Sequence, residues 1–257
     1  MVERLKYLRF LTWCGPVFLA VFIVFWGIMG HTIPPVPADL PAKDIGDMFR
    51  AEANGIRIGM GMAMMFAVFY LLWGLALAKI VEIGIEKDNN VLSTLAVWGA
   101  GLTVVPLMCS CVFWLAGAYR PEVLDDTILQ LLYDMGWLMI DMCFWVTSVQ
   151  MIALGMAFIQ DPRREPLIPK WMAWYGIWVG VSFVAELLMP YFKGGIFARQ
   201  GTLNFWIEFF VWFFWIVGLT TYMVSALRRL EAEARGATTT DRALAGDGVG
   251  KVAGATL

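Results

Sequence analysis

The chain has 257 residues, of which 60% are hydrophobic and only 16% are charged, and its mean hydropathy is +0.69. A soluble domain carries about 25% charged residues, so this composition excludes an ordinary soluble protein and predicts an integral membrane protein. The net charge of −2 lacks the concentrated basic face that nucleic-acid binding requires. We therefore expect the lipid bilayer, and no nucleic acid, among the partners.

Six apolar runs are each long enough to cross a bilayer, since a transmembrane helix needs about 20 residues. They are predicted at about 10–30, 56–81, 91–118, 128–159, 171–191 and 203–227. The sequence therefore predicts an all-α fold, a single bundle of six transmembrane helices over residues 1–228.

The segments outside the spans have their own patterns. An outer loop is predicted over 31–55, and its first part is rich in proline and cannot be helical throughout. Residues 42–53 then alternate apolar and charged side chains at helical spacing, which predicts a short interfacial helix. Residues 229–257 are rich in Ala, Gly and Thr, and we expect a disordered tail there.

Lysines and arginines predict the orientation, because they are enriched in cytoplasmic loops. If the N-terminus is cytoplasmic, 13 of the 19 lysines and arginines fall on the cytoplasmic side. We therefore predict a multi-pass protein with both termini in the cytoplasm.

Four carboxylates lie inside the predicted spans: Asp134 and Asp141 in the fourth, Glu186 in the fifth and Glu208 in the sixth. Ionisable groups at membrane depth are costly, and they usually face a cavity or a partner rather than lipid. With the predicted topology, all four converge in the outer half of the membrane. This predicts one polar site inside an apolar bundle.

The fourth span adds aromatic side chains to this site. Asp134, Trp137, Asp141 and Trp145 recur at spacings of three or four residues, so they share one helix face. Basic residues are expected at the same outer side, near the ends of other spans: His31, Arg57, Arg120 and Arg199. Together they predict an outward-facing pocket lined by acids and aromatic rings.

The sequence leaves two interpretations of the acids open. In the structural one, each acid pairs with an arginine or another donor and fixes the packing of the helices. In the functional one, an acid without a partner handles a proton or a polar ligand group. If the protein is an enzyme, Asp141 is the first candidate for proton donor or acceptor, with Glu208 or Glu186 as its counterpart.

No metal or cofactor is predicted. His31 is the only histidine, which excludes sites built on several histidines. Methionines in the second span and cysteines in the third resemble copper ligands in type. The methionines, however, recur at spacings that spread them around the helix, so core packing explains them better. The thirteen tryptophans suit a flat apolar ligand, but packing and lipid contact explain them more simply.

Three groups of motifs together resemble those of a family of uncharacterised six-span bacterial integral membrane proteins. The first group is residues 30–35 with 54–60, the second is 119–122 with 134–137, and the third is 192–198. The resemblance covers roughly residues 20–215, implies the six-span topology in a bacterial inner membrane, and implies no particular activity. The chain departs from the pattern after Phe197, where Arg199 and Gln200 stand in place of Trp and Asn.

Three classes of function fit these patterns. The one we favour is binding or transport of a small apolar or amphipathic molecule, such as a steroid, a terpenoid or an aromatic compound. The second is a membrane-embedded isomerase or cyclase that uses paired carboxylates. The third is an accessory subunit that packs against a partner in a larger membrane complex, or against a second copy of itself.

Overall fold

The computed structural model describes residues 2–86 and 90–252, and the surroundings of side chains for 6–86 and 90–236. Six helices of the described chain are long and apolar enough to cross a membrane. They are Lys6–Met29, Ala42–Gly84, Val91–Tyr119, Asp126–Ile159, Lys170–Tyr191 and Thr202–Gly236. The predicted all-α bundle with six transmembrane helices is therefore confirmed.

Four of the six spans change their helix type or break along their length. The elements, in chain order, are α1 (Val2–Val21), the π-helix η1 (Phe22–Met29), α2 (Ala42–Gly84), α3 (Val91–Tyr119), α4 (Asp126–Met142), α5 (Trp145–Ile159), α6 (Lys170–Ser182), the 3₁₀-helix η2 (Phe183–Tyr191), the π-helix η3 (Thr202–Ile207) and α7 (Glu208–Val252).

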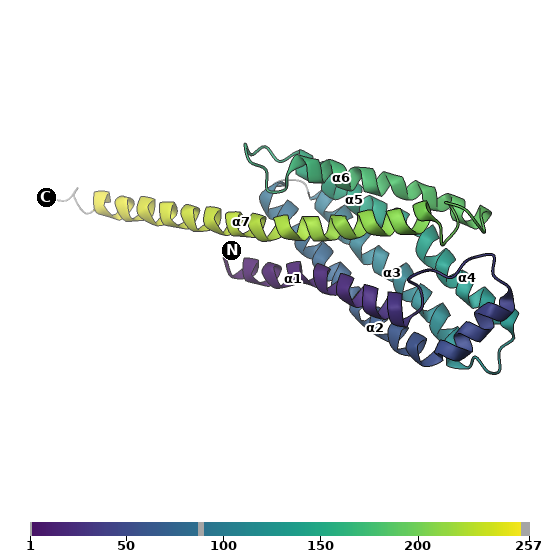
Figure 1. Cartoon of the computed structure of the whole chain (residues 1–257). Helices are drawn as coiled ribbons and strands as arrows, with labels where there is room; N and C mark the ends of the chain where they lie inside the picture. The colour runs from purple at the N-terminus through teal and green to yellow at the C-terminus, as the bar shows by residue number, and fades with distance from the viewer. Residues whose placement is uncertain (1, 87–89, 253–257) are drawn as a thin grey trace.

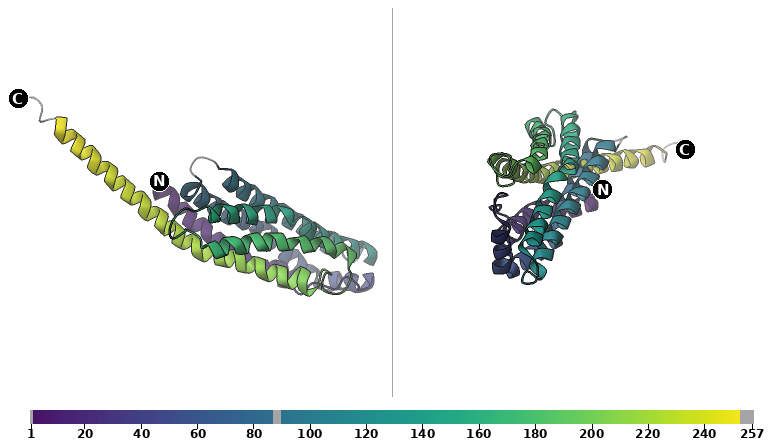
Figure 2. Two further views of the ribbon diagram at one scale, coloured as in Figure 1. Left: turned by 90° about the horizontal axis from the view of Figure 1, so that it is seen from above. Right: turned by 90° about the vertical axis from the view of Figure 1, so that its right-hand side faces the viewer.

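The helices run along one common direction, so that both termini lie at one end of the bundle (Figure 1). We call this the termini end, and the opposite end, which carries the segment 30–41, the proline-loop end. α2 packs against α1 and α3, α3 also packs against α5, and α5 packs against α6. α7 closes the bundle by contacting α1 and α6, and it projects beyond the bundle at the termini end (Figure 2).

The predicted interfacial helix over 42–53 is not a separate element. It is the first part of α2, whose 43 residues make a single rod. Its buried residues continue through the predicted boundary as one stripe: Ile45, Phe49, Ala53, Ile56 and Met60. Because this stripe packs without interruption, Gly55 does not end the helix, and the loop shortens from the predicted 31–55 to 30–41.

The tail also differs from the prediction. A disordered segment was expected from 229, whereas α7 continues to Val252, and residues 253–257 lie outside the described chain. Leu230 is buried, and Glu231 accepts a hydrogen bond from Arg9 of α1 at 2.6 Å. Contacts to the bundle therefore fix the start of a segment that composition alone describes as polar and flexible.

The core is filled by aromatic rings and closed by small residues where helices cross. Five of the thirteen tryptophans are almost fully buried: Trp26, Trp73, Trp114, Trp137 and Trp215. At Gly99 a Cβ atom would lie 2.7 Å from the Cβ of Gln150, so α3 and α5 approach closely only because this residue is glycine.

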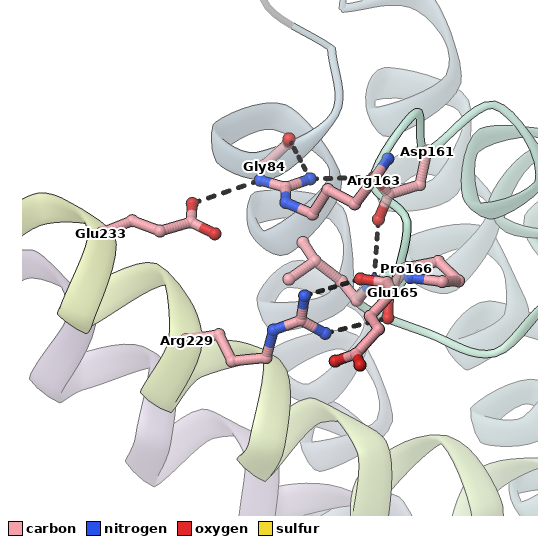
Figure 3. A network of polar contacts seen from close by, with 8 residues as sticks. Gly84, Asp161, Arg163, Glu165, Pro166, Arg229 and Glu233 are labelled. Atoms are coloured by element: carbon pink, nitrogen blue, oxygen red, sulfur yellow. Dashed lines mark hydrogen bonds and ion pairs between the residues drawn. The ribbon is translucent and has the colours of Figure 1, made fainter.

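A saturated polar network ties the segment between α5 and α6 to α2 and α7 at the termini end (Figure 3). Asp161, whose side chain is fully buried, accepts hydrogen bonds from the backbone N–H groups of Leu167 at 2.7 Å and Arg163 at 3.1 Å. The Arg163 guanidinium donates to Asp161 at 3.0 Å, to the Gly84 carbonyl at 2.9 Å and to Glu233 at 3.3 Å.

This network lowers the pKa of Asp161. Burial acts to raise the pKa of Asp161, but the N–H groups of Leu167 and Arg163 and the Arg163 guanidinium outweigh it and hold the pKa below its usual range. Arg229 of α7 adds two further hydrogen bonds, to the carbonyls of Glu165 at 2.6 Å and Pro166 at 3.1 Å (Figure 3). We call this group of residues the termini-end network.

Candidate functional site

Three of the four predicted acids come together inside the bundle. Asp141 lies in the last turn of α4, Glu186 in η2, and Glu208 is the first residue of α7. Their exposed fractions are only 6%, 8% and 4%. Glu186 and Glu208 line the same cavity, and the carboxyl groups of all three residues are close enough to interact electrostatically. We call these three residues the acid cluster.

A cavity of about 70 Å³ adjoins the acid cluster. Its polar lining consists of Thr103, Cys143, Thr147, Glu186 and Glu208. Its apolar lining consists of Pro106, Leu107, Ile140, Phe144, Phe183, Phe209 and Trp212. None of the lining residues is basic. Ile140, Cys143 and Phe209 are only half-buried, so the cavity is not sealed from the outside of the bundle.

The cavity lies where the surrounding helices are irregular. Pro106 interrupts the hydrogen bonding of α3 because it has no N–H to donate to the carbonyl four residues before it. The fourth span breaks between Met142 and Trp145, and η2 begins at Phe183. The sixth span changes from π to α at Glu208. Irregular backbone at membrane depth is tolerated where it is buried in protein or lines a cavity, and π-helical turns often occur at functional sites.

The break in the fourth span also shapes the cavity. The N–H of Phe144 donates to the carbonyl of Asp141 at 3.3 Å. This bond joins residues three apart, as in a 3₁₀-helix, whereas an α-helical bond joins residues four apart. Ile140, Cys143 and Phe144 on this turn all line the cavity. The sequence prediction of one continuous helix over 128–159 missed the break, because no glycine or proline marks it.

Glu208 lacks a hydrogen-bond donor within the described part of the chain. No N–H or O–H group of the described residues donates to either of its oxygens, nor to Oδ2 of Asp141. The side chain of Asn204, one turn earlier in η3, is likewise buried without a partner at either polar atom. Buried polar groups in native proteins are nearly always hydrogen-bonded, so this concentration of unpaired atoms calls for a ligand, water or shared protons.

Asp134 and Arg199 form a second polar group nearer the proline-loop end. The Arg199 guanidinium pairs with Asp134 and donates to the carbonyls of Val36 at 2.8 Å and Pro37 at 3.1 Å. It also lies 4.8 Å from the centre of the Tyr133 ring. Arg199 therefore fastens the proline-rich loop to α4. We call this group the loop clamp, and it borders a separate cavity of about 160 Å³ that Trp137 also lines.

Aromatic rings connect the two cavities. Trp137, which lines the second cavity, packs against Trp26 of η1 with ring centres 5.8 Å apart. Trp26 in turn stacks on Phe209, which lines the cavity at the acid cluster, at 5.7 Å. The structure thus places Trp137 in a buried ring cluster beside the predicted pocket.

The remaining basic residues that were expected near the acids lie elsewhere. Arg57 donates to the carbonyls of Ala118 and Tyr119 at 2.8 and 3.2 Å, and so caps the end of α3. Arg120 lies over the Tyr119 ring at 5.1 Å. His31 pairs with Glu52 at 3.1 Å at the surface. None of the three lines either cavity.

Trp145 also departs from the expected arrangement. Its side chain is 49% exposed, and it packs on Phe144 with ring centres 4.4 Å apart. The break before Trp145 changes the phase of the helix, so the face shared by Asp134, Trp137 and Asp141 does not continue into α5.

Several lining residues were not singled out from the sequence. Thr103, Phe183 and Phe209 come from three different spans, and nothing local distinguishes them from ordinary core residues. A usable signal was Pro106, because a proline in the middle of an apolar span frees a backbone carbonyl. Among the described residues, no group of three or more His, Cys, Asp or Glu side chains is arranged to hold a metal ion.

The fold and the site together define a polytopic α-helical membrane protein with an acidic, aromatic cavity between its spans. Comparisons with protein-family models, with curated proteins and with solved structures find no match to the chain.

Proposed function

We propose that the protein binds a small amphipathic molecule in the cavity beside the acid cluster. The observation that carries this proposal is Glu208, a buried carboxyl without a hydrogen-bond donor that faces a cavity lined by aromatic rings. A small-molecule site typically combines an apolar lining with a few converging polar groups, as this cavity does. Transport of the bound molecule is part of the same proposal.

The volume of the cavity limits what it can hold. At about 70 Å³ it is well below the roughly 300–1,000 Å³ of a site that encloses a drug-sized ligand. The cavity therefore accepts a polar head group. The apolar body of a steroid, a terpenoid or an aromatic compound would extend past half-buried Ile140 and Cys143 towards the lipid.

A purely structural role for the acid cluster accounts less well for these contacts. A buried acid that only fixes the fold is expected to be saturated with donors, because an unmade hydrogen bond at a buried charge is costly. Asp161 in the termini-end network fits that expectation, with two backbone N–H groups and a guanidinium donating to it. Glu208 accepts no hydrogen bond of this kind from any residue that the structure describes.

The membrane and the orientation belong to the same proposal. The predominance of lysines and arginines at the termini end supports cytoplasmic termini. The resemblance to six-span bacterial proteins supports a bacterial inner membrane. The proline-loop end, which borders the cavity at the loop clamp, would then face outward.

Native mass spectrometry of the gently purified protein tests the proposal. We expect a bound small molecule in the wild type and its loss in Glu208→Gln, while Glu122→Gln, which changes an exposed glutamate, retains it. A wild-type protein that carries no small molecule but co-purifies with a stoichiometric protein partner would overturn the proposal and favour an accessory subunit.

A further inference from the structure

The charges around the acid cluster do not balance. Asp141, Glu186 and Glu208 approach one another from α4, η2 and α7, and α3 contributes no ionisable side chain to the cavity. Arg199 interacts electrostatically with Asp141. Its guanidinium is already engaged by Asp134 and by the carbonyls of Val36 and Pro37. Three acids are therefore left with at most a share of one positive charge.

Three like charges cannot all persist in this position. Carboxylates within a few ångströms of each other in a poorly solvated environment repel strongly, so that at least one of them must hold a proton or a cation must be present. Glu186 and Glu208 line the same cavity and interact electrostatically, so a proton bound by either one removes the repulsion between them. In the absence of a ligand, protons neutralise the cluster.

The rest of the lining favours a cation over a neutral or negative group. Phe144, Phe183, Phe209 and Trp212 line the same cavity as the two glutamates. Aromatic faces attract ammonium groups through the negative potential of their rings, and the attraction grows when water is excluded. An anionic head would meet only repulsion from the acids, and a neutral head would gain nothing from the ring faces.

We propose that the polar head bound in this cavity is an organic ammonium group, which displaces a proton from the Glu186–Glu208 pair. This inference rests on the proposed function and names the class of its ligand. The exchange is balanced: one R–NH₃⁺ enters, the O–H bond of one carboxyl breaks, one H⁺ leaves to solvent, and the net charge of the site is unchanged. No oxidation or reduction takes part.

The exchange predicts that pH controls affinity. Because one proton leaves for each ammonium bound, affinity should rise by up to about tenfold per pH unit between about pH 6 and 8, where an alkylammonium stays protonated. The ionisable side chains that face the Glu186–Glu208 pair are Asp141 of the same cluster, Arg199, which interacts with Asp141, and Cys143 in the cavity lining, and in this scheme none of them exchanges a proton with the ligand.

A matched pair of probes tests the inference in lipid nanodiscs. Dodecylammonium and 1-dodecanol share one chain and differ in the charge of the head. Binding of each is measured against empty nanodiscs, and proton release is followed with a pH indicator in weak buffer. We expect the wild type to bind the ammonium at least tenfold more tightly than the alcohol and to release about one proton per ammonium. Glu122→Gln should do the same.

Glu208→Gln should lose both the preference and the proton release, and Glu186→Gln provides a second variant if the first does not fold. If the ammonium and the alcohol bind equally well, with no proton released, the cationic head is refuted and the proposed function survives. If neither probe binds the wild type, both proposals fail.

Discussion

The termini-end network and the acid cluster both bury carboxyl groups, yet they differ in every contact that those groups make. Asp161 accepts three hydrogen bonds within 3.1 Å, whereas Glu208, almost as deeply buried, accepts none from a donor of the described chain. Burial alone therefore does not identify a functional acid. The number of donors that the fold supplies to the acid separates the two regions, and mutations can test that separation.

The largest effect is expected from Asp161→Ala. Removing this carboxylate leaves the N–H of Leu167 and part of the Arg163 guanidinium without an acceptor, so we expect a loss of about 3–5 kcal/mol in the free energy of unfolding. Thermal unfolding of the purified protein measures it. Glu165→Ala is the matched control, because only the backbone carbonyl of Glu165 accepts a hydrogen bond in this network. Equal stability of the two variants would contradict the structural role.

Arg199→Ala should have the next largest effect. It removes the pair with Asp134 and two hydrogen bonds to the proline-rich loop, and we expect a loss of about 2–3 kcal/mol. The loop should also become more sensitive to proteolysis, which limited digestion detects. Arg120→Ala, which removes only a contact with the Tyr119 ring, should cost less than about 1 kcal/mol. A protected loop in Arg199→Ala would argue against the loop clamp.

A smaller effect is expected in how the stabilisation by Asp161 depends on pH. Because the pKa of Asp161 is lower in the folded than in the unfolded protein, its ionised form stabilises the fold. That contribution is complete above the unfolded pKa of about 3.9 and disappears as pH falls through the folded value. The difference in melting temperature between wild type and Asp161→Asn should therefore be constant above about pH 5 and shrink below it. A difference that grows on acidification would refute this assignment.

The smallest change in stability is expected from Glu208→Gln. No hydrogen bond to Glu208 from a donor of the described residues is lost, so the free energy of unfolding should change by less than about 1 kcal/mol. Thermal unfolding without added ligand measures it. A destabilisation as large as that of Asp161→Ala would show that Glu208 is a structural acid, and the contrast between the two regions would disappear.

The sequence was sufficient to predict the spans and to bring together three of the four acids that were expected to converge, whereas Asp134 pairs with Arg199 instead. Hydropathy reports helices of this length directly, and an ionisable group in an apolar run carries its own signal. It was not sufficient for the pairing of Arg199 with Asp134, because several arginines stood at plausible positions. Arg57 shows the reason, since it caps the backbone of α3 instead of meeting an acid. Such choices depend on helix rotation, which periodicity does not fix.

Two further features could not be predicted from the local sequence. The break at Cys143 carries no glycine or proline, and it turns Trp145 outward. The start of the tail is ordered through Arg9, which lies more than two hundred residues away in the chain. Both depend on tertiary contacts that override composition.

The uninterrupted course of α2 has a consequence for how the protein can change in length. An inserted or deleted residue in its middle would rotate everything beyond by about 100°, because a helix has 3.6 residues per turn. The hydrogen bond from Arg57 to α3 and the hydrogen bond from Arg163 to the Gly84 carbonyl could then not both be kept. The fourth span, already broken at 143–144, has a joint that can absorb such a change. α2 sets the register of the whole molecule, and we expect it to tolerate substitutions far better than insertions or deletions.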